Sequence, residues 1–210
     1  MKKRRLIIVG AGGFGRELEM HLSAVGESER EWQVAGYIDD NMEALKQFES
    51  DYSILGRTHE FEFQLNDLAV LAVATPKTKR TLFEQMESKV EFFTFVSRSA
   101  VISKFSRIGR GCILGPNVIV GPNVSVGDAV FLNSGTMIGH DVTIGAFSTL
   151  MANNNIAGGC SIGSEVYCAS SATVIPNRRI CDGAFIGAGS VVIRNVSQPR
   201  TVYGNPAKYL

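Results

Sequence analysis

The chain has 210 residues, which suits one large domain or two small ones with a sizeable buried core. Its 21 lysine and arginine residues nearly balance its 20 aspartate and glutamate residues. A strongly basic surface is therefore not expected, and nucleic acid is not an expected partner. No stretch approaches the roughly 20 apolar residues that a membrane span requires, so no membrane span is expected.

The basic opening at residues 1–5 is followed by the apolar run Leu6–Val9, an order that signal peptides share. That run is too short for a signal peptide and breaks at once into glycines, so we expect a cytoplasmic protein. The cysteines all lie in the second half, without CxxC spacing or a histidine partner. We expect them to be small buried side chains rather than disulfides or zinc ligands: Cys112, Cys160, Cys168 and Cys181.

Strands and helices alternate through residues 1–95, which we assign to an α/β domain. Apolar runs predict strands at Leu6–Val9, Trp32–Ile38, Ala69–Ala74 and Val90–Phe95, and helical spacing predicts helices at Phe14–Val25 and Thr78–Glu87. Residues 41–64 are polar and mixed, which predicts loops and short elements. The alternation predicts a parallel sheet with helices on its faces.

The first predicted strand runs into the sequence GAGGFG at residues 10–15, which satisfies GxGxxG and opens a helix. Backbone N–H groups at a helix N-terminus favour phosphate oxygens, and glycines let the chain approach them. Asp39 and Asp40 end the second strand, at a distance suited to a ribose or base contact. A domain of about 90 residues has room for one mononucleotide-binding half, which argues against NAD. The alternative is that the loop serves only tight strand–helix packing.

From Val96 onward the sequence repeats every six residues without an insertion. Seventeen hexads follow one another, from VSRSAV to VIRNVS, and the first position of every hexad is apolar. The second position is glycine more often than any other residue, and the fifth is usually small or valine. This period replaces the alternation of the first half, so we place a second domain at residues 96–210.

A coil with a triangular cross-section explains the six-residue period. Each hexad forms one flat side, three sides form one turn, and successive turns stack at about 4.8 Å. The first residue of each hexad then points inward, and the glycine after it permits a close backbone approach. The hexads predict a little under six turns of parallel β-helix, in which each repeat depends on its neighbours.

These hexads resemble the hexapeptide-repeat acyltransferases, whose coil is left-handed, an exception to the usual right-handed crossover. With the GAGGFG loop included, the whole chain resembles the sugar acyltransferase family of the NeuD and PglD type. The resemblance implies a Rossmann-like half domain followed by a left-handed β-helix. It also implies a homotrimer and an acetyl-CoA-dependent enzyme that acts on nucleotide-linked amino sugars or on sialic acid, without a metal.

The resemblance places a catalytic pair at His140 and Asp141 in the sequence MIGHDVTIG, and His140 is the only histidine of the repeats. A neutral imidazole, with a pKa near 6.5, suits the removal of a proton from an amine or hydroxyl that attacks a thioester. The carboxylate would orient the ring and stabilise the imidazolium. The alternative is a polar residue at a corner of the coil.

The resemblance also assigns the remaining site residues. In the N-terminal domain the Asp pair would contact the nucleobase, and the loop and Thr75 would lie near the diphosphate and sugar. Substrate-binding residues would be Gly10, Gly12, Gly13, Phe14, Asp39, Asp40, Thr75 and Asn133. For acetyl-CoA, the Gly158 amide would hold the thioester carbonyl, Ala188 would lie beside the pantetheine arm, and Lys208 in YGNPAK near a phosphate. Lys208 is alternatively a solvated terminal charge.

Several positions depart from the family pattern. Relatives often place a histidine where Phe14 stands, and some carry a second histidine where Thr149 stands. The run Asn153-Asn154-Asn155 is unusually polar for a coil, and Asn154 falls at an inward fifth position, where it must find hydrogen-bond partners. Arg178 falls at the same kind of position, which predicts a local bulge or a subunit contact.

Three other functions remain as alternatives to N-acetylation of a nucleotide-linked amino sugar. The same residues would serve O-acetylation of sialic acid or a related sugar. A γ-type carbonic anhydrase shares the coil but needs three histidines for zinc, and the single histidine of the repeats argues against it. The last alternative is a non-catalytic, nucleotide-binding assembly protein.

Overall fold

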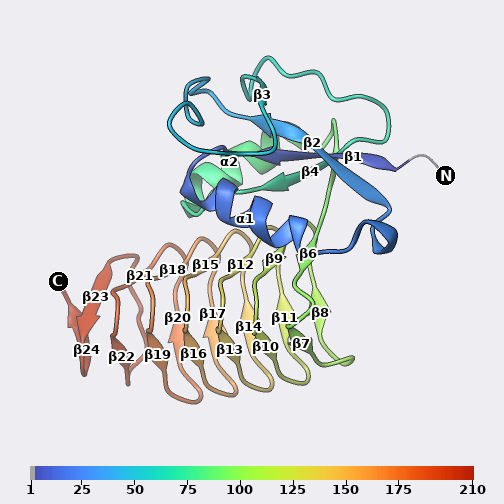
Figure 1. The fold of residues 1–210 in the computed structure, drawn as a ribbon. Helices are drawn as coiled ribbons and strands as arrows, with labels where there is room; N and C mark the ends of the chain where they lie inside the picture. The colour runs from blue at the N-terminus through green and yellow to red at the C-terminus, as the bar shows by residue number, and fades with distance from the viewer. Residues whose placement is uncertain (1–2) are drawn as a thin grey trace. The chain divides into compact units, whose positions relative to one another are not determined.

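The computed structural model describes residues 3–210, so Met1 and Lys2 of the basic opening lie outside the described residues. The chain divides into two compact units (Figure 1). The first contains the residues up to Ala74 together with Thr81–Phe93, and the second contains Thr75–Arg80 together with Thr94–Leu210. In the described part of the chain, no helix combines the length and apolar character needed to cross a membrane.

The first unit is built on a five-stranded parallel sheet with the strand order β3-β2-β1-β4-β5. Leu6, Ile7, Ile8 and Val9 of the central strand are completely buried, as expected for a parallel strand covered on both faces. The elements of this half of the chain are β1 Arg4–Val9, α1 Gly13–Ser23, a 3₁₀ turn at Glu27–Glu29, β2 Trp32–Ile38, β3 Ile54–Gly56, β4 Leu68–Leu71, α2 Pro76–Met86 and β5 Glu91–Phe92. The beginning of α2, up to Arg80, belongs to the second unit.

The predicted strands and helices of this half are confirmed, but only Trp32–Ile38 has the predicted ends, and the last two strands change most. The strand expected at Ala69–Ala74 begins at Leu68 and ends at Leu71. The strand expected at Val90–Phe95 is divided in two, because the Phe93 N–H donates to the Ala69 carbonyl while the Phe95 N–H donates to the Cys112 carbonyl, each at 2.8 Å. The chain therefore leaves one sheet and enters another within three residues.

The second unit is the parallel β-helix that the hexads predicted (Figure 1). Its two-residue strands pair with strands 18 residues further on, so each sheet forms one side of the triangle. The first sheet contains β6 Phe95–Val96, β9 Ile113–Leu114, β12 Phe131–Leu132, β15 Thr149–Leu150, β18 Tyr167–Cys168 and β21 Phe185–Ile186, extended by β23 Thr201–Gly204 and β24 Ala207–Tyr209. The second contains β7 Val101–Ile102, β10 Ile119–Val120, β13 Met137–Ile138, β16 Asn155–Ile156, β19 Thr173–Val174 and β22 Val191–Val192. The third contains β8 Arg107–Ile108, β11 Ser125–Val126, β14 Thr143–Ile144, β17 Ser161–Ile162 and β20 Arg179–Ile180.

The inward positions of the hexads form one continuous apolar column from Cys112 to Val202. Val96 pairs in register with the inward Leu114 but is 40% exposed, because β6 is the edge strand of its sheet and no turn precedes it. Cys112, Cys160 and Cys168 are free and buried as predicted, whereas Cys181 is only half-buried.

Two polar residues at inward positions behave differently. Asn154 is buried, and its amide donates to the Met151 carbonyl, but its Oδ1 has no hydrogen-bond partner among the described residues. The bulge predicted at Arg178 is absent from the described coil, because Ser161–Ile162 and Arg179–Ile180 pair in regular register. The half-buried Arg178 side chain instead donates from Nε to the Pro176 carbonyl at 3.1 Å.

Candidate active site

His140 and Asp141 occupy the corner of the coil between β13 and β14. The His140 Nδ1 lies 2.7 Å from the Asp141 Oδ2, and the two side chains are 67% and 55% exposed. Because an ionised carboxylate only accepts hydrogen bonds, Nδ1 is the donor in this pair and Nε2 keeps its lone pair when the ring is neutral. The hydrogen bond from His140, and then one from Asn123, lower the pKa of the Asp141 carboxyl below its ordinary value.

The backbone of this corner is held by the turns on both sides. Asp141 has a left-handed conformation, with φ of 58°, which aspartate and asparagine tolerate better than most residues. Its N–H donates to the Pro122 carbonyl at 3.0 Å, and the His140 carbonyl accepts from the Gly159 N–H at 2.9 Å. The pair therefore stands on a rigid part of the coil although its side chains are open to solvent.

Gly158 lies against the imidazole of His140 in the next turn. A Cβ atom at residue 158 would come within 2.5 Å of Nε2 and 2.6 Å of Cε1 of His140. Some other hexads carry alanine at the third position, as at Ala146 and Ala152, so the coil itself accepts a side chain there. The histidine ring, rather than the backbone, therefore requires glycine at residue 158. Within the described part of the chain, the Gly158 N–H has no hydrogen-bond partner.

Asn133 and Ala188 lie at a different corner of the coil from His140. Asn133 follows β12, so it stands at the opposite end of β13 from His140, and it is buried with its Oδ1 accepting from the Ser134 N–H at 2.6 Å. Ala188 is exposed and follows β21 in the same sheet as β12. Lys208 is exposed on β24 and lines a cavity of about 210 Å³ with Arg194 and Asn195. A single coil thus brings together His140, Asp141 and Gly158 but not the other coil residues predicted for the site.

The glycines of the GAGGFG loop serve two different purposes. A Cβ at residue 15 would lie 2.1 Å from the Gly10 carbonyl oxygen, so Gly15 permits close packing of α1 on the loop, and Gly10 has φ of 105°. Gly12 and Gly13, in contrast, are exposed, and a Cβ at residue 12 would meet nothing within 4 Å. Gly12 caps α1 with no side-chain hydrogen bond to its first turn. Tight packing therefore explains only two of these glycines, and the other two leave space at a helix N-terminus.

Asp39 connects this loop to the end of β2. Its Oδ2 accepts from the Ala11 N–H at 2.7 Å, and its Oδ1 accepts from the Asn41 N–H at 2.8 Å. β2 and β4 flank β1 in the sheet, so this is the carboxyl edge at the point where the strand order reverses, where open α/β sheets bind ligands. The sequence suggested a ligand contact for Asp39 but gave no sign of this bond to the loop.

Asp40, Thr75 and Phe14 complete the predicted residues of this half. Asp40 is exposed, and its Oδ1 accepts from the hydroxyl and the N–H of Thr58, which lowers the pKa of the carboxyl. Thr75 is exposed after β4, and its carbonyl accepts from the Lys79 N–H in the first turn of α2. Phe14 is half-buried in the first turn of α1.

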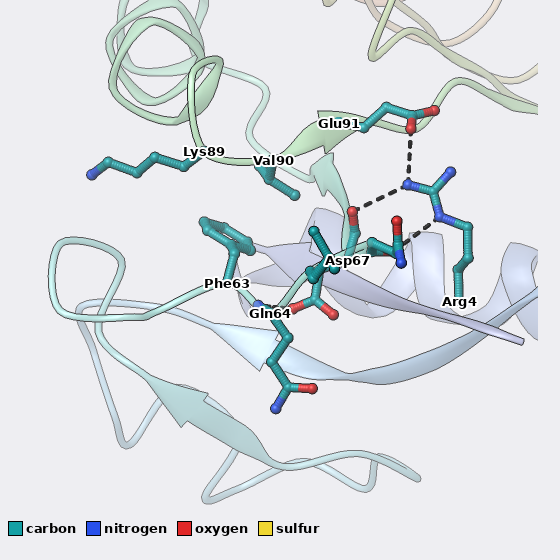
Figure 2. A pocket seen from close by; sticks show the side chains of 9 residues that line it. Arg4, Phe63, Gln64, Asp67, Lys89, Val90 and Glu91 are labelled. Carbon is teal, nitrogen blue, oxygen red and sulfur yellow. Dashed lines mark hydrogen bonds and ion pairs between the residues drawn. The ribbon is translucent and has the colours of Figure 1, made fainter. Parts of the chain in front are cut away.

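A cavity of about 400 Å³ lies at the other edge of this sheet (Figure 2). Arg4, at the beginning of β1, donates there to the Asn66 carbonyl at 2.9 Å and to Glu91 Oε2 at 2.8 Å. Figure 2 shows the Arg4 guanidinium turned toward Glu91, so these two charges neutralise one another. Because ligands of open α/β sheets bind at the carboxyl edge, we assign this cavity no part in the site.

Lys79 is an unexpected feature of the second unit. The side chain is 2% exposed, and Nζ donates to the Ser148 carbonyl at 3.1 Å and to Thr149 Oγ1 at 2.9 Å. Burial lowers the pKa of the amine to about 7, a change that interaction with Cys112 opposes. The helical pattern placed Lys79 in a helix, but nothing in the sequence indicated its burial. Among residues 3–210, no group of three or more His, Cys, Asp or Glu side chains could hold a metal ion.

Two family models match the chain, one in each half. Residues 5–86 match the PglD N-terminal domain, and residues 105–140 match the bacterial transferase hexapeptide with its six repeats. The fold and these matches define the class of the protein, a hexapeptide-repeat acyltransferase. Within that class the N-terminal half matches the PglD type, so the resemblance noted in the sequence is confirmed.

Solved structures with the same fold extend over almost the whole chain. The acetyltransferase domain of PglB from Neisseria gonorrhoeae FA1090, also solved in complex with acetyl coenzyme A, has a TM-score of 0.89 and 23% identity, covering 99% of this chain and 100% of that chain. PerB from Caulobacter crescentus, solved with CoA and GDP-perosamine, has a TM-score of 0.87 and 25% identity, covering 98% and 96%. WeeI from Acinetobacter baumannii AYE has a TM-score of 0.73 and 22% identity, covering 99% and 100%. The predicted fold class, including the left-handed β-helix, is confirmed. A search of curated proteins finds no match to the chain.

Proposed function

We propose that the protein transfers an acetyl group from acetyl-CoA to the amine of a nucleotide-linked aminodeoxy sugar, with His140 as the general base. The observation that carries the proposal is the corner of the coil, where Asp141 holds Nδ1 and leaves Nε2 beside Gly158. A neutral imidazole in this arrangement suits proton removal near neutral pH.

The reaction follows from the groups at this corner. The amine nitrogen attacks the thioester carbonyl carbon, His140 Nε2 takes the proton that the nitrogen loses, and the carbon–sulfur bond breaks. The imidazolium returns the proton to the departing sulfur, which leaves as the CoA thiol. Asp141 stabilises the imidazolium that forms. The Gly158 N–H, which has no partner in the described residues, would donate to the oxygen as it gains negative charge. Ala188 and Lys208 would contact the pantetheine arm and a phosphate of the same co-substrate.

The first unit supports a nucleotide-linked acceptor. Gly12 and Gly13 leave open space at the N-terminus of α1, where backbone N–H groups favour a diphosphate. Asp39 holds this loop in position, whereas the exposed Asp40 would contact the base, and Phe14 and Thr75 would lie near the diphosphate and sugar. PerB, which shares the fold at 25% identity, was solved with a nucleotide-linked sugar and CoA, and this supports the same pair of substrates.

Release of the CoA thiol tests the proposal. The purified protein would receive acetyl-CoA with GDP-, UDP- and dTDP-linked amino sugars and, separately, free sialic acid. We expect thiol release with a nucleotide-linked amino sugar and a loss of at least about 100-fold in His140→Ala, because general base catalysis contributes roughly 10²–10⁴-fold. Ser164→Ala, at the same hexad position elsewhere in the coil, is the control and should keep full activity. Full activity in His140→Ala would contradict the mechanism, and turnover of sialic acid alone would favour O-acetylation.

We also propose that three copies assemble through the second sheet of the coil. Val101, Ile119 and Met137 lie side by side on β7, β10 and β13 and are 63%, 42% and 48% exposed, whereas the same turns of the third sheet present Arg107, Ser125 and Thr143. A cyclic trimer would cover this apolar stripe and could bring the Asn133 corner of one copy to the His140 corner of another. Sedimentation should give the mass of three chains, and Ile119→Glu should give the mass of one. A wild-type mass of one chain would refute the trimer.

A further inference from the structure

Asn123 lies one turn before Asp141, at the corresponding corner of the coil. The two residues are 18 positions apart, and they have nearly equal φ values of 60° and 58°. Strands β11 and β14, which follow these corners, pair in regular register, so the side chains are stacked along the coil. The Asn123 Nδ2 donates to Asp141 Oδ1 at 3.0 Å.

This hydrogen bond completes the support of the Asp141 carboxylate. The other oxygen, Oδ2, is 2.7 Å from His140 Nδ1, so each carboxylate oxygen has one partner. The Asp141 side chain is 55% exposed, and an exposed carboxylate with a single partner would rotate more freely. With two partners on opposite oxygens, the plane of the carboxylate is fixed, and so is the direction from which it holds the ring.

The chemistry of the position favours asparagine. The residue must adopt the left-handed conformation and must also present an N–H to a carboxylate, and asparagine does both with a short side chain. An aspartate at residue 123 would place its carboxylate next to that of Asp141 in the following turn, and the two negative charges would repel each other. The same sequence, Gly-Pro-Asn-Val, also occurs one hexad earlier at residues 115–118, where Asn117 has φ of 57°. The Asn123 corner therefore differs from the Asn117 corner only in what the asparagine meets in the next turn. The residue 18 positions after Asn117 is Gly135, which offers no side chain.

We propose that Asn123 is a positioning residue for acetyl transfer, which fixes the Asp141 carboxylate from the preceding turn so that Asp141 in turn orients His140. The inference rests on the proposed function of His140 and Asp141. It assigns to Asn123 no contact with either substrate.

A double-mutant cycle tests this role. The variants are Asn123→Ala, Asp141→Ala and the double variant, with Asn117→Ala as the matched control in both backgrounds. Alanine is compatible with this corner conformation, because Ala129 adopts φ of 52° in the same coil. The measurements are kcat, KM for each substrate, the pH profile of kcat/KM and the thermal unfolding midpoint.

We expect Asn123→Ala to lower kcat roughly three- to tenfold, the range of one hydrogen bond, with both KM values unchanged. In the Asp141→Ala background the same substitution should have no effect, because its target is gone. The acid limb of the pH profile should move to lower pH in Asn123→Ala, since a less well placed carboxylate stabilises the imidazolium less. Asn117→Ala should leave kcat unchanged and lower the unfolding midpoint as much as Asn123→Ala does.

Three results would overturn the role of Asn123. They are a loss that persists in the Asp141→Ala background, an equal loss in Asn117→Ala, and a higher acceptor KM with kcat unchanged, which would place Asn123 against the acceptor. The outcome for His140→Ala separates this inference from the proposed function. If that variant is inactive while Asn123→Ala behaves like Asn117→Ala, only the positioning role fails. If His140→Ala is fully active, the proposed function itself fails.

Discussion

The two units of the chain place their candidate site residues by different means. In the coil, the position of a residue in its hexad decides whether it faces inward, outward or into a corner, and the residue 18 positions later decides what it touches. His140, Asp141 and Gly158 meet in this way. In the α/β unit, Ala11 and Asp39 are far apart in sequence and meet because β2 is the neighbour of β1 in the sheet.

Because of this difference, we expect mutations to affect the coil corner and the carboxyl edge of the sheet in different ways. A corner of the coil repeats at every turn, so a change there affects the side chains above and below it and leaves the regular pairing in place. The carboxyl edge of the sheet occurs once, and it depends on a single close approach between the loop and α1. Substitutions of glycine test the comparison in both units.

The largest effect is expected at Gly15. Gly15→Ala would place a Cβ 2.1 Å from the Gly10 carbonyl oxygen, and because both groups are backbone-held, the helix must shift. We expect the α/β unit to lose more than about 3 kcal/mol of stability, in the range of severe overpacking, as measured by denaturant unfolding. Gly12→Ala is the control, since its Cβ meets nothing within 4 Å, and it should unfold like the wild type while it weakens binding of the nucleotide-linked sugar. Equal stability in Gly15→Ala and Gly12→Ala would remove the distinction between packing and ligand-facing glycines.

A smaller effect is expected from Gly158→Ala in the coil. The added methyl group would displace the His140 ring, so kcat should fall roughly 10- to 100-fold, a penalty typical of a misplaced catalytic group. The thermal unfolding midpoint should change little, because other hexads carry alanine at this position. Ala152→Gly, the reverse exchange at the same hexad position, serves as the control for backbone effects. An unchanged kcat in Gly158→Ala would mean that the ring works from another position.

The smallest effect is the pH dependence expected from Lys79. Its pKa in the folded chain, about 7, lies below its ordinary value of 10.5, so unfolding takes up a proton between these values and stability rises with pH. The slope is at most about 1.4 kcal/mol per pH unit. Buried thiols oppose this rise in stability at higher pH, because burial raises the pKa of Cys112 to about 11 and that of Cys168 to about 12. Unfolding should therefore be followed from about pH 7 to 8.5, below the ordinary pKa of a thiol.

Lys79→Met should flatten this dependence, since the buried amine is then gone. Lys104→Met removes an exposed lysine of the coil and should leave the slope as it is in the wild type. Equal slopes in the wild type and Lys79→Met would show that Lys79 keeps its proton in the folded chain.

Much of the fold followed from periodicity. The period of six predicted the triangular coil and its inward column, because a regular backbone repeats the same environment at each step. At Val96 the register is kept but burial is incomplete, because the regular environment ends there. For Arg178 it predicted a bulge or a subunit contact. The bulge is absent from the described coil, because the side chain turns back to the Pro176 carbonyl and the register is kept.

The candidate site was predicted less completely than the fold. Motif and resemblance identified His140 and Asp141 as a pair, and their contact is local because they are neighbours in sequence. The bonds from Asn123 to Asp141 and from Asp39 to the loop were not predicted, since each joins residues that only folding brings together. The sequence did hold one signal for the first bond, the 18-residue spacing between an asparagine and an aspartate at equivalent corners.

The amino-acid sequence by itself determined the two kinds of architecture, the glycine-rich loop and the histidine–aspartate corner, because each depends on local spacing. Only the tertiary structure decided which glycines pack and which remain open, that Lys79 is buried, and that Asn133 stands at a different corner from His140. The physical reason is that burial and close approach are properties of pairs of segments. The pairing of those segments depends on strand order and on the stacking of turns.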